Sequence, residues 1–326
     1  MKAMLCKAYG PPESLTLEDI EPAAPGDNDV RIDVRAAGVN FPDVLIIQGK
    51  YQFKPPFPFA PGAEAAGDVV EVGSKVEHVK PGDRVIANTG HGAFAEQVTT
   101  SARRVMAMPD EMDYVTGASI SLTYGTTAHA FIQRADLQPG ETVLVHGASG
   151  GVGLAAVEMA RAMGAHVIAT GGNDEKLKVA AEHGAEHVIN YSAGPFKDRV
   201  KELTGGKGAD VIYDPVGGDV FDQSLRCINW GGRLLVIGFA SGRIPEAPAN
   251  LALLKGCAIV GVFWGAYTER DPAGNARNFE RIFGWWREGK LKPHVSHRFP
   301  LARASDALYA LIERKVTGKA VIEIGA

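Results

Sequence analysis

A glycine-rich turn lies between an apolar stretch and an amphipathic one, where a nucleotide phosphate could bind. Residues 143–146, Val-Leu-Val-His, run into residues 147–153, Gly-Ala-Ser-Gly-Gly-Val-Gly. The paired glycines leave no side chain between backbone amides and a pyrophosphate, and the last glycine lets the following helix pack closely on the strand. The helix N-terminus also attracts negative charge, although a tight connection without a ligand is the alternative. We predict dinucleotide binding by Ser149, Gly150, Gly151, Val152 and Gly153.

The end of the next apolar stretch bears on which dinucleotide binds. Gly172 stands where an Asp or Glu would pair with the ribose hydroxyls of NAD and repel the extra phosphate of NADP. Asp174 follows two residues later, where we expect it to begin a helix. Lys176 in the first turn of that helix could reach a 2′-phosphate, or it is an ordinary solvated lysine. NADPH is thus the predicted cofactor, and the residues predicted at this end of it are Thr170, Gly172, Lys176 and Tyr191.

Composition and charge indicate a small-molecule partner. The 326 residues suggest about two domains, and a hydrophobic content of 45% is enough for a core. The net charge is −4 without runs of like charge, so we expect neither nucleic acid nor a membrane surface as partner. No apolar run is long enough to span a bilayer and none resembles a signal segment, which favours a cytoplasmic protein. The three scattered cysteines indicate no disulfide framework.

Two patterns of elements divide the chain. Residues 1–122 contain short apolar strands separated by Pro and Gly, which predicts a β-rich unit. From about residue 123, apolar strands alternate with amphipathic helices, which predicts a doubly wound parallel sheet. After residue 289 single strands return, and we expect this tail to rejoin the first unit. The strands expected in the parallel sheet are 142–146, 166–170, 187–190, 211–214, 233–237 and 258–262.

Several motifs together resemble the medium-chain dehydrogenase/reductase superfamily. They are residues 62–67 (Gly-Ala-Glu-Ala-Ala-Gly), 81–85 (Pro-Gly-Asp-Arg-Val), the glycine turn, and 214–218 (Asp-Pro-Val-Gly-Gly). Three further segments most resemble the NADPH:quinone oxidoreductase family: 38–43, 236–242 and 261–265. The resemblance covers almost the whole chain. It implies a GroES-like catalytic domain of residues 1–122 with 290–326, and a Rossmann NADP-binding domain of residues 123–289.

The same resemblance bears on metal binding. Zinc alcohol dehydrogenases of the superfamily have a Cys where this chain has Asn40 and a His where it has Ala63. Because catalytic zinc needs about three converging protein ligands, we expect no metal and interpret Glu64 as a structural carboxylate. Without a Lewis acid, the substrate must accept hydride readily, as quinones and conjugated carbonyl compounds do.

Two residues are candidates for handling the acceptor. The resemblance places Asn40 near the nicotinamide, where its amide could also hold a substrate oxygen; the alternative is a cap of the following short helix. Tyr51 falls where related 2-enoyl thioester reductases carry a tyrosine that delivers a proton. The alternative is that Tyr51, with Phe53, Phe57 and Phe59, lines an apolar pocket or packing surface.

The resemblance implies further cofactor contacts. Thr126 matches a position near the nicotinamide, although a Thr at a helix start is also an ordinary cap. Val216, Phe239 and Phe263 follow the carboxyl ends of predicted strands, where open α/β sheets bind ligands; the alternative is that they belong to the core. A further alternative is that Phe263 and Trp264 contact a second subunit.

We therefore predict an NADPH-dependent reductase of quinones or α,β-unsaturated carbonyl compounds, working without metal. One alternative is a reductase of enoyl or acryloyl thioesters or haloacrylates, indicated by Tyr51 and by Lys50 and Lys54 if these rim the cleft. Another is a non-catalytic NADPH-binding or redox-sensing protein. In the family, edge strands of two Rossmann domains pair, so residues 257–263 predict a homodimer.

Overall fold

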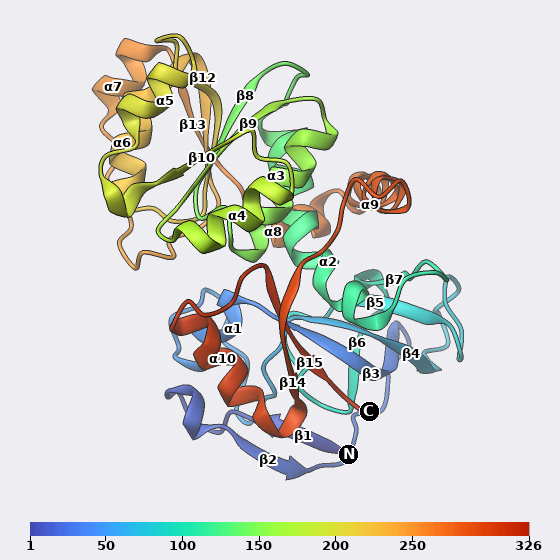
Figure 1. Ribbon diagram of the computed structural model, residues 1–326. Coiled ribbons are helices and arrows are strands. Elements are labelled where there is room, and N and C mark those ends of the chain that lie inside the picture. The colour runs from blue at the N-terminus through green and yellow to red at the C-terminus, as the bar shows by residue number, and fades with distance from the viewer. Residues whose placement is uncertain (326) are drawn as a thin grey trace. The chain divides into compact units, whose positions relative to one another are not determined.

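Six parallel strands form the sheet of residues 123–292 in the computed structural model, which describes residues 1–325 (Figure 1). The strand order is β10-β9-β8-β11-β12-β13, so the chain starts in the middle, builds outward on one side, and then returns to build on the other. The predicted doubly wound sheet is confirmed. Its strands are β8 (Thr142–Val145), β9 (His166–Gly171), β10 (His187–Asn190), β11 (Ala209–Asp214), β12 (Ile228–Val236) and β13 (Ala258–Gly261).

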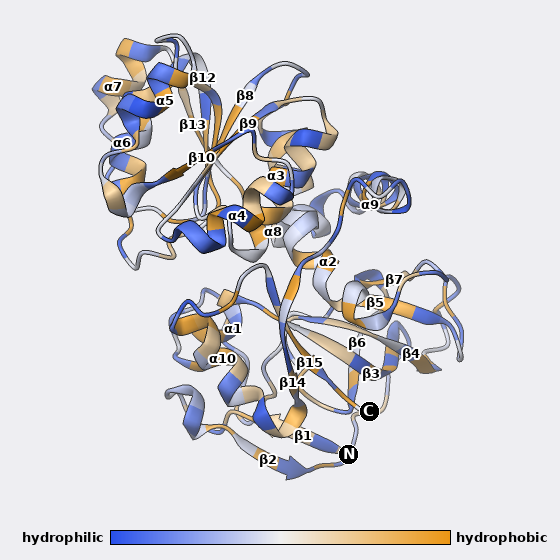
Figure 2. Ribbon diagram, in the orientation of Figure 1, coloured by the Kyte–Doolittle hydropathy of each residue, from blue (hydrophilic) through white to orange (hydrophobic). Residues whose placement is uncertain are grey.

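Helices cover this sheet on both sides. Figure 1 shows α3 and α4 on one side and α5, α6 and α7 on the other. Strand β8 is hydrophobic, whereas α4 and α9 alternate hydrophilic and hydrophobic residues around their axes, as expected for helices with one solvated face (Figure 2). The helices are α2 (Tyr114–Ala128), α3 (Gly151–Ala162), α4 (Asp174–Glu182), α5 (Lys197–Leu203), α6 (Asp219–Cys227), α7 (Ala249–Lys255), α8 (Trp264–Arg270) and α9 (Pro272–Arg287). A π-helical segment, His129–Arg134, continues α2.

The second unit comprises residues 1–122 and 293–325 and is built on a seven-stranded sheet. Its order is β14-β15-β3-β4-β5-β7, with β6 also paired to β3, and a separate hairpin joins β1 to β2. The strands are β1 (Lys2–Leu5), β2 (Thr16–Asp19), β3 (Asp29–Val39), β4 (Glu64–Val72), β5 (Arg84–Asn88), β6 (Gln97–Ser101), β7 (Val105–Ala107), β14 (Val295–Pro300) and β15 (Lys319–Glu323). The helices are α1 (Phe41–Ile47) and α10 (Ala304–Ile312).

Strand β3 organises this unit because it pairs with β4, β6 and β15. Its first half alternates buried and half-buried residues, whereas residues 36–39 are all buried. Glycine is required at position 38, since a Cβ there would lie 2.1 Å from the carbonyl oxygen of Ala118 and 2.5 Å from Glu64 Oε2. The missing side chain lets the Glu64 carboxylate approach the end of β3.

No helix within residues 1–325 is both long and apolar enough to cross a membrane.

Candidate functional site

The turn between β8 and α3 is closed by backbone contacts that exclude side chains. Gly147 has a φ of 56°, in the left-handed region, and a Cβ on Gly153 would lie 2.2 Å from the Gly147 carbonyl oxygen. The Ala148 amide donates to the Thr170 carbonyl at 3.0 Å, which ties the turn to the end of β9. The N-cap residue Gly150 makes no side-chain hydrogen bond, so the first turn of α3 has no side-chain cap. The segment fits a phosphate group.

Gly172, just after β9, packs closely against Tyr191 and Ser192. A Cβ on Gly172 would stand 3.1 Å from Ser192 Oγ and 3.3 Å from Tyr191 Cε2, so a carboxylate side chain there would have to displace these neighbours. Lys176 lies in the first turn of α4, and partial burial lowers the pKa of its ammonium. Asp174 begins α4 as predicted, and its carboxylate accepts from Asn190 Nδ2 at 2.9 Å.

Thr170 lies beneath the turn rather than on its surface. Its side chain is fully buried, and its hydroxyl is 2.7 Å from His146 Nδ1. His146 Nε2 is in turn 2.8 Å from Ser224 Oγ on α6. Burial lowers the pKa of His146 to about 3, so this histidine is neutral and links three elements of the sheet edge.

The remaining residues predicted near the cofactor follow the strands β11, β12 and β13. Val216 is half-buried, and its amide donates to the Asp214 carboxylate at 2.8 Å. Phe239 is 37% exposed and Phe263 is 63% exposed, so the alternative that they belong to the core is wrong. These side chains and the glycine turn all lie at the carboxyl-end edge of one sheet.

Thr126 lies near the end of a helix and not at the start of one. Thr126 belongs to the last turn of α2, so the alternative that it caps a helix start is wrong. A Cβ on the preceding Gly125 would lie 2.6 Å from the Trp264 ring. Trp264 is 5% exposed and donates to Asn275 Oδ1 at 2.9 Å, so it packs inside its own unit and is not free for a subunit contact.

A polar cluster occupies the end of β3 in the other unit. Lys319 Nζ donates to Asn40 Oδ1 at 2.6 Å, to Glu64 Oε2 at 2.9 Å and to the Val39 carbonyl oxygen at 3.4 Å. The other Glu64 oxygen accepts from Ser121 Oγ at 3.0 Å and from a backbone amide of α2. The side chains are all at most 5% exposed. Glu64 is held as the structural carboxylate that we expected.

Asn40 uses its side chain inside this cluster. Its Nδ2 donates to Glu64 Oε2 at 3.0 Å and to the Gly38 carbonyl oxygen at a longer 3.4 Å. Asn40 is also the N-cap residue of α1 and forms a capping box with Asp43, so the alternative that it caps this helix is confirmed. Its backbone amide donates to Asp43 Oδ2 at 2.8 Å. Burial raises the pKa of Asp43 to about 7, although Lys319 acts in the opposite direction.

Tyr51 lies on the segment after α1. It is half-buried against the core of its unit, and within residues 1–325 its hydroxyl makes no hydrogen bond. Burial and the nearby Asp43 carboxyl raise the pKa of this phenol, which keeps it protonated at neutral pH. The Phe53 ring is 51% exposed and stacks on His91 with ring centres 5.8 Å apart. The segment therefore presents both a protonated hydroxyl and aromatic surface.

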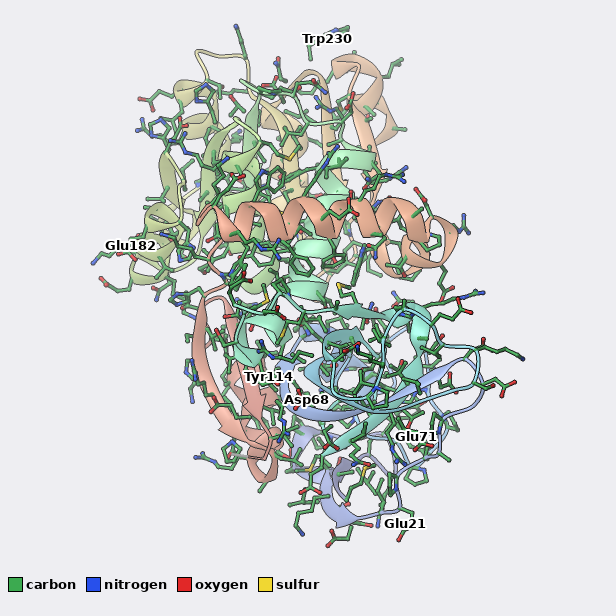
Figure 3. All side chains as sticks on the ribbon, turned by 90° about the vertical axis from the view of Figure 1, so that its right-hand side faces the viewer. Glu21, Asp68, Glu71, Tyr114, Glu182 and Trp230 are labelled. Carbon is green, nitrogen blue, oxygen red and sulfur yellow. The ribbon has the colours of Figure 1, made fainter. Side chains whose placement is uncertain are left out.

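A separate hollow of this unit has a volume of about 560 Å³. Its wall includes Tyr114, which points toward Asp68 and donates to it at 2.5 Å (Figure 3). The two arginines that line it are paired, Arg35 with Asp68 and Arg298 with Glu323. We assign no ligand to this hollow.

Comparison with known proteins places the chain in a family. Residues 26–110 match the model of the alcohol dehydrogenase GroES-like domain, and residues 151–277 match that of the zinc-binding dehydrogenase. The quinone oxidoreductase-like protein 2 of Mus musculus is 41% identical over 324 residues, which are 99% of this chain and 92% of that protein. This chain belongs to the quinone oxidoreductase family.

Solved structures agree with this membership. The quinone oxidoreductase of Escherichia coli, determined in complex with NADPH, has a TM-score of 0.92 at 31% identity and covers 99% of this chain and 100% of its own. A 2-haloacrylate reductase has a TM-score of 0.88 at 31% identity, with both chains fully covered. The prediction of a quinone oxidoreductase-type enzyme of the medium-chain superfamily is confirmed.

The donor set of this family member does not fit zinc. Lys319 places an ammonium between Asn40 and Glu64, and Ala63 offers no ligand atom. Within the described residues 1–325, no three His, Cys, Asp or Glu side chains lie together as a metal ligand set would.

Sequence reasoning missed three residues in or beside the polar cluster: Ser121, Asp43 and Lys319. Asp43 was part of a recognised motif but was not singled out, although an acid at the third position of a helix is a known partner for the N-cap amide. Lys319 begins an apolar strand 279 positions after Asn40, and no local pattern distinguishes it from a solvated lysine.

Proposed function

We propose that this member of the quinone oxidoreductase family reduces quinones or α,β-unsaturated carbonyl compounds with hydride from NADPH, without a metal. The observation that carries the proposal is a pair of close approaches at one sheet edge that favour glycine: Gly153 against the Gly147 carbonyl in the uncapped turn, and Gly172 against Tyr191 and Ser192. The first fits a pyrophosphate, and the second leaves the end of β9 without an acid that would repel a 2′-phosphate. NADPH in the complex of the Escherichia coli relative supports the same cofactor.

The end of the cofactor site at β9 favours NADPH over NADH. Gly172 lacks the acid that would bind two ribose hydroxyls, and Lys176 supplies positive charge in the first turn of α4. Because that ammonium is partly desolvated, it would attract a phosphate more strongly than a fully solvated lysine would.

When bound, NADPH supplies a hydride. Asn40 would hold the acceptor oxygen through the N–H that now makes only the 3.4 Å bond to Gly38. Tyr51 holds a proton at its hydroxyl, available for a substrate that needs one after hydride transfer. The exposed rings of Phe53 and Phe57 give an aromatic surface suited to a flat acceptor.

A second candidate function, reduction of enoyl thioesters or haloacrylates, is favoured by the protonated, unbonded hydroxyl of Tyr51 and by the similarity to a 2-haloacrylate reductase. Such substrates need a proton at carbon, whereas a quinol oxygen can take one from water.

The test is steady-state reduction of a panel of quinones, enones, enoyl thioesters and haloacrylates, each with NADPH and NADH. We expect quinones or enones to have the highest kcat/KM, and NADPH to exceed NADH by about 10- to 100-fold, since a hydrogen bond to a charged group contributes about 1.5–3 kcal/mol. A clear preference for thioesters or haloacrylates would select the second function. Tight binding of NADPH without turnover of any acceptor would instead support the sensing alternative.

We also propose a homodimer formed through β13. This strand lies at the edge of its sheet, and nearby apolar side chains are unusually exposed: Trp230 at 75%, Leu253 at 79% and Leu254 at 68%. Trp230 projects outward from its unit (Figure 3). Sedimentation velocity would test this, and a monomer at micromolar concentration would contradict it.

A further inference from the structure

Lys319 is the one buried lysine among residues 1–325. It is the first residue of β15, and its side chain is 5% exposed. A buried ammonium is costly unless hydrogen-bond acceptors surround it, and here three oxygens do so: Asn40 Oδ1, Glu64 Oε2 and the Val39 carbonyl. The chain therefore builds a complete cation-binding arrangement around its own side chain.

This arrangement permits only one orientation of the Asn40 amide. The carbonyl oxygen faces the ammonium at 2.6 Å, and Nδ2 faces the Glu64 carboxylate at 3.0 Å. A flipped amide would place its NH₂ against the ammonium and its oxygen against the carboxylate, so it would lose both hydrogen bonds and gain two repulsive contacts. The neighbouring cation and anion together therefore fix which way the Asn40 carboxamide is turned.

The fixed orientation determines which N–H of Asn40 is available. One hydrogen of Nδ2 is committed to Glu64 by a charge-assisted bond. The other makes the 3.4 Å bond to the Gly38 carbonyl, which is long for an N–H···O bond. Replacing this weak hydrogen bond by one to the oxygen of the substrate therefore costs little free energy.

We propose that Lys319 is a positioning residue for the reduction, fixing the Asn40 carboxamide so that its weakly bonded N–H is offered to the acceptor oxygen. The inference rests on the proposed function, in which Asn40 holds that oxygen. A purely structural role is the competing explanation, because β15 is paired to β3 and Lys319 also strengthens that contact.

The first experiment is a kinetic double-mutant cycle. Lys319→Met should lower kcat/KM about 10- to 100-fold, the loss typical when the group that orients a catalytic side chain is removed. Asn40→Ala should lower it at least as much, and the double variant should be no worse than Asn40→Ala alone. The matched control is Arg233→Met, which breaks a half-buried ion pair with Glu141 in the other unit. It should lower the melting temperature and leave kcat/KM within about twofold.

The second experiment restores the missing ammonium and covers the case in which Lys319→Met folds poorly. Lys319→Ala should regain part of its kcat/KM in millimolar methylammonium chloride, which offers N–H donors, but not in tetramethylammonium chloride at the same ionic strength. The ¹⁵N-resolved side-chain NH₂ resonances of Asn40 should shift in Lys319→Ala and return with methylammonium, a readout that needs neither cofactor nor turnover.

Two results would overturn the positioning role. One is a Lys319 variant that melts lower but keeps its kcat/KM, as the Arg233 control does. The other is a double variant, Lys319→Met with Asn40→Ala, whose loss of kcat/KM equals the product of the losses in the two single variants. Failure of the proposed function has a different signature, since the wild-type protein would then reduce no quinone or conjugated carbonyl compound at all.

Discussion

The protonation of Asp43 makes a prediction about stability that needs no substrate. The carboxyl is 2% exposed, accepts the Asn40 amide at 2.8 Å and faces Glu64 and Lys319 across the cluster, with Tyr51 nearby. Burial raises its pKa from 3.8 to about 7. Each tenfold change in proton affinity is worth about 1.4 kcal/mol, so up to about 4 kcal/mol of unfolding free energy depends on this one proton.

The sign follows from the direction of the pKa change. Between pH 4 and pH 7 the folded protein holds a proton on Asp43 that the unfolded chain has released, so the folded state is favoured by acid. The contribution is fully present below the unfolded pKa of about 3.8, is lost progressively as the pH rises to about 7, and is absent above that. Asp43→Asn keeps an oxygen acceptor for the Asn40 amide but cannot titrate.

The assay is urea unfolding of the wild type and Asp43→Asn at several pH values from 4.5 to 8.5. The free energy of unfolding of the wild type minus that of the variant should fall by about 3 kcal/mol across this range, with most of the fall below pH 7. The control is Asp110→Asn, which makes the same chemical change at an exposed carboxyl. A wild-type minus variant difference that does not change with pH would refute a buried, protonated Asp43.

Four further predictions concern the cofactor and the acceptor. Gly153→Ala should weaken NADPH binding in a fluorescence titration by about tenfold or more, because its Cβ would meet the Gly147 carbonyl oxygen at 2.2 Å and push α3 from the turn; unchanged affinity would mean that the turn does not carry the phosphate. Lys176→Met should cut kcat/KM for NADPH about 10- to 100-fold with little effect on NADH, and an equal loss for both would remove Lys176 from the phosphate site. Gly172→Asp should narrow or reverse the cofactor preference, measured as the ratio of the two kcat/KM values, while a constant ratio would mean that the missing acid at this position does not set the preference. Tyr51→Phe should change quinone reduction by less than about threefold but lower enoyl thioester reduction about 10²- to 10⁴-fold; equal rates on every substrate would exclude Tyr51 as a proton donor.

The sequence predicted the parallel sheet well because each of its strands contains a short apolar run between turn or helix signals. The turn at 147–153 shows this best, since glycine, strand and helix are adjacent in the chain and the packing constraint on Gly153 is local. Observed strand ends differ from the predicted ones where pairing with a neighbouring strand lengthens a strand. Strand β12, for example, begins at Ile228, whereas the sequence predicted a start at residue 233.

The polar cluster was less predictable because its members come from distant elements. Asn40 is a helix cap, as its position suggests, and only the ammonium of β15 shows that its side-chain amide also belongs to a buried polar cluster. Trp264 looked suited to an interface, but Gly125 on α2 leaves the space that buries it. These contacts depend on long-range packing that neither composition nor periodicity encodes.

The position of β15 in the chain has a consequence for the order of synthesis. Strands β14 and β15 are translated after all of residues 123–292, yet they complete the sheet that β3 begins. While the ribosome makes the parallel-sheet unit, the earlier unit lacks both strands, and Glu64 lacks the ammonium with which it pairs. Cotranslational folding can therefore finish the nucleotide-binding unit first, and the Asn40 cluster closes only when Lys319 has left the exit tunnel.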